Sequence, residues 1–525
     1  MPIGPMNDFF LALIWGIGVL LALAGWGRLL ALATGQGRGR TSWLAAPAWG
    51  IAVSGLLAGL LNEAGLAFRS VDIGYVAVGI ALCLTTAIIS LRASAPPAGE
   101  ALRETLRDPV WKLLLAIVLA ALAARFCSSI IVSAFNPGSA WRGFRLNPHD
   151  DMHSYLVSAE RLLQTGTLGI DPFNSRLVMS GFGTQHFLNA LVLTVLPPDN
   201  VHLLEGGIGL AALCLAAAAV GLRLRLSRRA VLLLMAIPLL MQWLFINISS
   251  TVTAAAVLTA LVAWGMQPWE KADRRRRIGY AIAGGVLLGG ACSLKGTVIP
   301  PACAFAGLWA ILQIARTRSW RAIEVAVIAG LATLATLAAW MAWSYACGGT
   351  ALYPLLGKGH MAVAFGILPN LPTQPLADGV TAAMEMGMWA PIIAVILLIA
   401  AWSWRRTRAA APAESWSAVI AAAVAWLASW PVLALATQMP DVERYLAPAR
   451  AMAVVPAIGA ALLLGSWAAA HLPASRLRFA GTIAFLALLV TTAPEWIWTY
   501  GVQVPRDIGE SVAGLPEASI AGTEI

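Results

Sequence analysis

Charged residues are scarce in this chain. Only 11% of its 525 residues are charged and 59% are apolar, whereas about 25% of the residues of a typical soluble domain are charged. Such a chain cannot cover a soluble surface of this size, which excludes an ordinary soluble protein. Its apolar runs are long and continuous, whereas transmembrane β-barrels use short alternating segments. The composition therefore predicts an all-α, polytopic membrane protein, with ~20 residues in each span.

Lysine and cysteine are scarce as well. Four of the 35 basic residues are lysine, and most arginines form short clusters between apolar runs. Such clusters are typical of cytoplasmic loops. The net charge of +10 therefore indicates contact with membrane lipids and no nucleic-acid partner. The six cysteines lie in or beside apolar runs without metal-ligand spacing, which predicts neither a disulfide framework nor a metal site.

Hydropathy divides the chain into about fourteen predicted membrane spans. Their boundaries carry an error of about two to four residues. The predicted spans are 9–33, 43–67, 72–91, 111–135, 201–222, 229–246, 250–266, 278–294, 297–315, 322–345, 385–404, 416–437, 447–469 and 479–499.

The basic residues predict the orientation of these spans. They cluster in every second loop, beginning with Arg38 and Arg40 and ending with Arg476 and Arg478. Because cytoplasmic loops carry the excess of Lys and Arg, both termini are expected on the outer side. The short loops suit a bacterial inner membrane, whose outer side is periplasmic. We therefore expect a multi-pass protein of that membrane.

Two long loops are predicted on the outer face, at residues 136–200 and 346–384. The first contains the adjacent carboxylates Asp150 and Asp151, which precede a segment with apolar residues at helical spacing. That segment predicts a short amphipathic helix that lies at the membrane surface and ends at Gly166. One of the two aspartates is expected at its N-cap. A plain capping role is the simpler alternative to catalysis, but one cap needs only one carboxylate.

The outer face also carries cations that could stabilise a leaving phosphate. An ionised carboxylate near the membrane surface could accept a proton from an acceptor hydroxyl. A lipid-linked phosphate that then departs needs positive charge nearby. Lys295, Lys358 and Arg444 are the outward candidates. The alternative for each is a snorkelling cation at a helix end, and for Arg444 an ion pair with Glu443 or Asp441.

Four of the six histidines fall in the outer loops, and we expect them to bind phosphate or sugar by hydrogen bonds. They are His149, His153, His186 and His360. A divalent metal held by Asp150, Asp151 and His153 stays open as an alternative, although this spacing matches no standard metal motif. No cofactor is otherwise predicted.

The outer loops resemble those of GT-C-type integral membrane glycosyltransferases. Three elements carry the resemblance, in the order of the family. They are the acidic pair and helix that begin Asp150-Asp151-Met152-His153-Ser154-Tyr155 and continue to Asp171-Pro172-Phe173, the Tyr353-Pro354 element, and Glu443-Arg444-Tyr445-Leu446-Ala447-Pro448.

The resemblance implies a GT-C-like catalytic core over residues 111–499, a three-helix accessory segment at 1–110 and an outward tail at 500–525. It implies an inverting transfer from a polyprenyl-phosphate-linked sugar to a glycan, lipid or protein acceptor. Asp150 or Asp151 would be the general base, and Lys295, Lys358 and Arg444 would contact the donor phosphate. The implied substrate-binding residues are His149, His153, Tyr155, Asp171, His186, Tyr353, His360 and Tyr445.

Two other functions remain as alternatives. A transporter or flippase of a lipid-linked or polar solute would keep ionisable residues near the bilayer midplane, where these spans are nearly free of charge. A polysaccharide polymerase or ligase also uses a long outer loop, but usually relies on paired arginines and a histidine without an acidic pair at a helix start.

Overall fold

The computed structural model describes residues 5–37, 40–93, 107–135, 154–169, 182–241, 243, 248–351, 413–437 and 442–471. Within these ranges the chain is helical and contains no strand, which confirms the all-α prediction. Ten described helices are long and apolar enough to cross a membrane, which confirms a multi-pass membrane protein. The predicted spans 385–404 and 479–499 lie outside the described residues.

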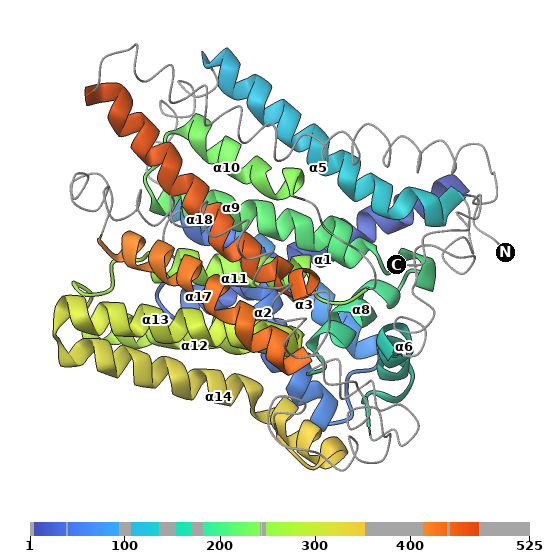
Figure 1. Ribbon diagram of the computed structural model, residues 1–525. Helices are drawn as coiled ribbons and strands as arrows, with labels where there is room; N and C mark the ends of the chain where they lie inside the picture. The colour runs from blue at the N-terminus through green and yellow to red at the C-terminus, as the bar shows by residue number, and fades with distance from the viewer. Residues whose placement is uncertain are drawn as a thin grey trace.

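The long helices run roughly side by side across the molecule in Figure 1. One of the ten, Pro198–Arg223, combines a π-helical turn, η4 (Leu204–Gly209), with α9 (Leu210–Arg223). The other nine are α1 (Pro5–Ala33), α2 (Arg40–Glu63), α3 (Arg69–Ala93), α5 (Pro109–Phe135), α12 (Arg274–Leu294), α13 (Ile299–Thr317), α14 (Trp320–Gly348), α17 (Ala413–Thr437) and α18 (Val442–His471).

Two helices are shorter than the spans expected at 229–246 and 250–266. Helix α10 (Arg228–Leu240) has 13 residues and α11 (Val252–Gly265) has 14. At 1.5 Å per residue, α11 extends about 21 Å, which is less than the ~30 Å hydrocarbon core. Helix α10 ends at Leu240, two residues after Pro238, and the backbone of the next residue, Met241, is extended. The membrane crossings predicted at 229–246 and 250–266 are therefore not among the ten long helices and stay predictions, and α11 follows a segment of buried residues.

Helix α2 packs closely on α1 and also contacts α9, α11, α12 and α14. Its Gly50 has no room for a side chain, since an added Cβ would lie 1.7 Å from the Leu23 carbonyl oxygen of α1. On another side, the Trp340 indole of α14 donates a hydrogen bond to the Gly55 carbonyl at 2.7 Å. The N-terminal helices are therefore packed into the same bundle as the later ones.

The helix predicted in the first outer loop is present as α6 (Leu156–Thr165). Gly166 ends it with φ +79°, as the sequence predicted, and Leu156, Ala159 and Leu162 face the protein. Tyr155, rather than an aspartate, holds its N-cap position and makes no side-chain capping bond. Together with α8 (Thr184–Leu193), α6 lies at the right-hand end of the bundle in Figure 1.

Candidate functional site

Lys295 lies where α12 ends, beside the first turn of α18. Its backbone is extended, with φ −158°, and its side chain is 9% exposed. The ammonium group donates a hydrogen bond to the Ser249 hydroxyl at 2.8 Å and lies 5.3 Å from the Tyr445 ring centroid. Two of the predicted residues, Lys295 and Tyr445, are thus brought together from distant parts of the sequence. Arg444 is the neighbour of Tyr445 in α18, but its side chain is outside the described part.

The Ser249 hydroxyl belongs to an irregular segment that precedes α11. The next hydroxyl, on Ser250, donates to the Gln185 side-chain carbonyl of α8 and to the Leu294 carbonyl of α12. The Gln185 amide in turn donates to the Ile248 carbonyl at 2.8 Å. Irregular backbone at membrane depth is tolerated where it is buried in protein or lines a cavity. These bonds satisfy it and join α8, α11 and α12 around Lys295.

Glu205, in η4, holds the first turn of α11. Its carboxylate accepts hydrogen bonds from the backbone N–H groups of Thr251, Val252 and Thr253 at 3.0, 2.5 and 3.2 Å, and a further bond from the Thr253 hydroxyl. It is 3% exposed. A carboxylate at a helix N-terminus satisfies unpaired donors and complements the helix dipole. Glu205 is not among the predicted site residues, because in the sequence it is only an acidic residue at the start of an apolar run.

His186 and Tyr155 connect the two short helices at this end of the bundle. Their ring centroids are 5.8 Å apart, and His186 is 1% exposed. Burial lowers the pKa of His186 to about 4, although a hydrogen bond with the backbone of Tyr155 opposes this shift. The imidazole is therefore neutral near pH 7. At the start of α8, the Thr184 hydroxyl donates to Ser293, two residues before Lys295.

These contacts gather four of the predicted site residues at one end of the bundle: Tyr155 with His186, and Lys295 with Tyr445. Gln185, the neighbour of His186, bridges the two pairs through Ser250. The arrangement offers one buried cation, hydroxyl groups and an aromatic face, which are suited to an anionic group. The other predicted site residues lie outside the described residues: Asp150, Asp151, His149, His153, Asp171, Tyr353, Lys358 and His360.

A metal site was left open at Asp150, Asp151 and His153, all outside the described ranges. Among the residues that are described, no group of three His, Cys, Asp or Glu side chains could hold a metal ion. The metal alternative therefore stays a prediction.

Comparison of the chain with known protein families, curated proteins and solved structures finds no match. The geometry around Lys295 and the resemblance of the outer-loop motifs are therefore the grounds on which a function can be argued.

Proposed function

We propose that this protein is an inverting glycosyltransferase of the bacterial inner membrane, acting at the periplasmic face. It would transfer a sugar from a polyprenyl-phosphate donor to a glycan, lipid or protein acceptor, with a GT-C-like core. The observation that carries the proposal is the position of Lys295. This cation is buried at a helix end, beside Ser249 and Tyr445. Ser250 connects this place to Gln185 of α8, whose neighbour His186 packs on Tyr155, four residues after Asp151 in the sequence.

The proposed reaction uses two charged groups of opposite sign. Asp150 or Asp151 accepts the proton of the acceptor hydroxyl, and the resulting oxygen attacks the anomeric carbon. The bond between that carbon and the phosphate oxygen breaks, and the polyprenyl phosphate leaves with the electron pair. Lys295 stabilises the negative charge that develops on the phosphate, together with Arg444 and Lys358. Because His186 is buried, its part is to support Tyr155 rather than to contact substrate.

A transporter or flippase is the second candidate, and the start of α11 is the feature that bears on it. Helix α11 has only 14 residues and starts among buried residues, and transporters often direct the N-termini of half-helices at anionic substrates. In this protein, however, Glu205 already occupies the first-turn N–H groups of α11. An anionic substrate would have to displace a buried carboxylate, so this feature favours a fixed structural end over a transport site.

The test compares Lys295→Met with Lys271→Met, a control at the exposed Lys271. Loss of a cation that stabilises a leaving phosphate removes about 3 kcal/mol or more of transition-state stabilisation, so we expect kcat/KM to fall at least about 100-fold in Lys295→Met. The control should keep wild-type activity. The assay follows sugar transfer from a synthetic polyprenyl-phosphate donor by the detergent-purified protein, and thermal unfolding verifies that both variants fold.

Asp150→Asn and Asp151→Asn complete the test, and at least one of them should abolish transfer. Full activity of Lys295→Met would contradict the phosphate role, and full activity of both aspartate variants would contradict the base. If wild-type protein in liposomes moves a labelled lipid-linked sugar between leaflets and never transfers it, the flippase is the correct function.

A further inference from the structure

An apolar groove opens between α2 and α3, at the end of the bundle that carries α6. Both helices pack on α1, but over their described lengths they make almost no contact with each other, which leaves a gap above α1. The turn that follows α2 lies beside α6, since the Ala67 N–H donates to the Gly166 carbonyl at 2.8 Å. The groove has a volume of about 570 Å³, which is within the ~300–1,000 Å³ of typical ligand pockets.

The floor of the groove contains Trp26 of α1 and Tyr75 of α3. Their rings stack, with centroids 5.0 Å apart and an interplanar angle of 23°. The Trp26 indole donates to the Tyr75 carbonyl at 3.2 Å, and the Tyr75 hydroxyl shares a hydrogen bond with Ser54 at 2.7 Å. The polar atoms of both side chains are therefore satisfied by the protein. The rest of the lining is leucine, valine, alanine and glycine, so a ligand would meet almost only carbon.

The groove is continuous with the surface that faces lipid. Helices α1, α2 and α3 are all long and apolar enough to span a membrane. Three residues of the lining, Leu60, Leu66 and Val78, are exposed, and Ile73 and Leu84 continue this exposed apolar surface along α3. Water does not fill an apolar groove, and an empty one would leave its lining without contact atoms. Hydrocarbon from the membrane is therefore the occupant that this surface favours.

The dimensions of the groove suit one hydrocarbon chain. Leu57 and Ala64 of α2 lie seven residues apart, as do Val71 and Val78 of α3, which corresponds to about 10 Å along a helix. This length is less than the ~15 Å that one leaflet contributes to the hydrocarbon core. A helix of a partner protein does not fit inside, because a segment about 10 Å long and about 10 Å wide fills roughly 800 Å³.

We propose that this groove binds an acyl chain of a membrane phospholipid. The polyprenyl chain of the proposed donor is the less suitable occupant, because its phosphate would lie near Lys295. Tyr75 packs edge to face on Phe187 of α8, with ring centroids 5.3 Å apart, so the floor of the groove lies against α8 and the groove opens elsewhere. The phospholipid site is distinct from the site around Lys295 and does not depend on the proposed function.

Gly74 of α3 leaves room for the ligand and provides the means to remove it. A Cβ added to Gly74 would meet no atom within 4 Å, although Gly74 lines the groove. A phenylalanine there should fill the groove without displacing protein atoms, and replacement of a helical glycine improves helix propensity. Gly330 of α14 is the matched control, because it is exposed, a Cβ there also meets no atom within 4 Å, and α14 contributes nothing to the groove.

The experiment uses the full-length protein in liposomes of phosphatidylethanolamine and phosphatidylglycerol. A trace of phosphatidylethanolamine carries a photoactivatable diazirine in one acyl chain. After illumination, mass spectrometry of peptides measures the label on residues 57–78 and, for ordinary lipid contact, on α14 (Trp320–Gly348). The variants are Gly74→Phe, Val78→Trp and the control Gly330→Phe, and thermal unfolding verifies that each one folds. A second arm adds unlabelled polyprenyl phosphate as a competitor.

We expect several-fold more label per residue on 57–78 than on α14, and loss of this excess in Gly74→Phe. Val78→Trp should reduce the excess as well, and it decides the test if Gly74→Phe does not fold. Gly330→Phe should keep the wild-type excess. Equal labelling of the two segments, or an excess that persists when a folded variant fills the groove, overturns the proposal. Loss of the excess on addition of polyprenyl phosphate assigns the groove to a prenyl chain and overturns the acyl chain.

Discussion

The imidazole of His186 is expected to make the stability of the protein depend on pH. Its pKa in the folded state is about 4 because the ring is buried, whereas an unfolded histidine has a pKa near 6.5. Between these values the unfolded chain binds more protons than the native one, so stability is full above about pH 6.5 and falls as the pH drops towards 4. The loss approaches about 3 kcal/mol, which thermal unfolding at pH 7.0, 6.0 and 5.0 would reveal.

His186→Phe keeps a buried ring of similar size next to Tyr155 and removes the titration. We expect this variant to lose less stability between pH 7.0 and 5.0 than the wild type. A wild-type curve that is flat over this interval, or an unchanged slope in the variant, would show that His186 is not buried in its neutral form.

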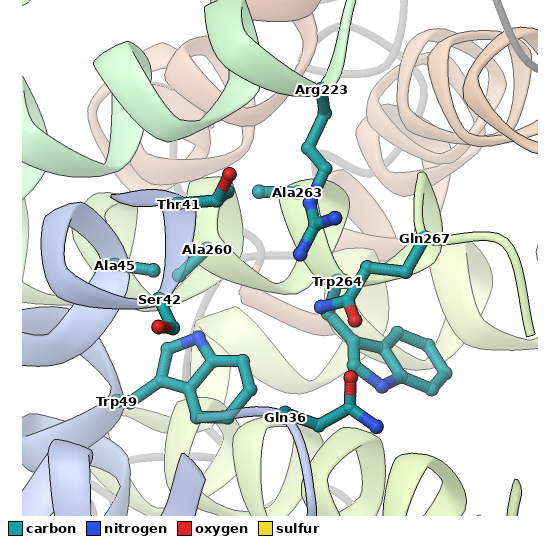
Figure 2. A pocket seen from close by; sticks show the side chains of 10 residues that line it. All are labelled: Gln36, Thr41, Ser42, Ala45, Trp49, Arg223, Ala260, Ala263, Trp264 and Gln267. Carbon is teal, nitrogen blue, oxygen red and sulfur yellow. The ribbon is translucent and has the colours of Figure 1, made fainter. Parts of the chain in front are cut away.

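Some site residues can be found in the sequence because they interrupt apolar runs. Lys295 is one of four lysines and lies between two predicted spans, and this position predicts a cation that contacts the donor phosphate. Arg223 could not be singled out in the same way, because it heads a cluster typical of an inner loop. Only the fold shows that its guanidinium points towards Trp49 (Figure 2), a residue 174 positions earlier in the chain.

At the level of single elements, α11 is the most informative helix. Its start contacts Glu205 beside the Lys295 site, and residues of its last turns, including Trp264, line a small cavity together with Arg223. The sequence predicted an ordinary span over 250–266, because a hydropathy profile does not distinguish a full helix from a short one that follows a buried irregular segment. The side-chain and backbone hydrogen bonds that make this segment acceptable, such as those of Ser250 and Gln185, come from other parts of the chain.

Glu205 should contribute much of the stability of α11. Glu205→Ala leaves three backbone N–H groups and the Thr253 hydroxyl without their acceptor, and we expect the free energy of unfolding to fall by about 3 kcal/mol. Glu205→Gln keeps one carbonyl acceptor and should lose about 1 kcal/mol. Thermal or denaturant unfolding of the detergent-purified protein measures both changes.

Asp273 provides the comparison, because it caps α12 through the Arg276 N–H at 2.8 Å while its side chain stays exposed. Asp273→Ala should therefore cost about 1 kcal/mol, as exposed caps usually do. If Glu205→Ala costs no more than Asp273→Ala, burial of the carboxylate adds nothing to the capping of α11.

At the scale of the whole molecule, the N-terminal helices pack against the later ones, as the contacts of α2 with α12 and α14 show. The sequence predicted an accessory segment at 1–110 because three further spans precede the span at 111–135 that leads into the loop with the acidic pair, and this division stays a prediction. Hydropathy indicated that these helices exist, but not what they touch, since contacts between distant helices depend on small residues with no hydropathy signal. Gly290 of α12 is an example: a Cβ added there would lie 2.4 Å from the Ala52 Cα of α2.

Residues 1–100 should consequently be required for the rest of the chain to fold. Without α2, the Trp340 indole loses its acceptor on Gly55, and the faces of α12 and α14 that pack on α2 lose their partner. We expect residues 101–525, expressed alone, to be degraded or to aggregate, and to accumulate and co-purify when 1–100 is supplied as a second chain. Immunoblots and gel filtration of the membrane fraction measure this. Stable accumulation of 101–525 by itself would show instead that the later helices form a bundle to which the first three merely dock.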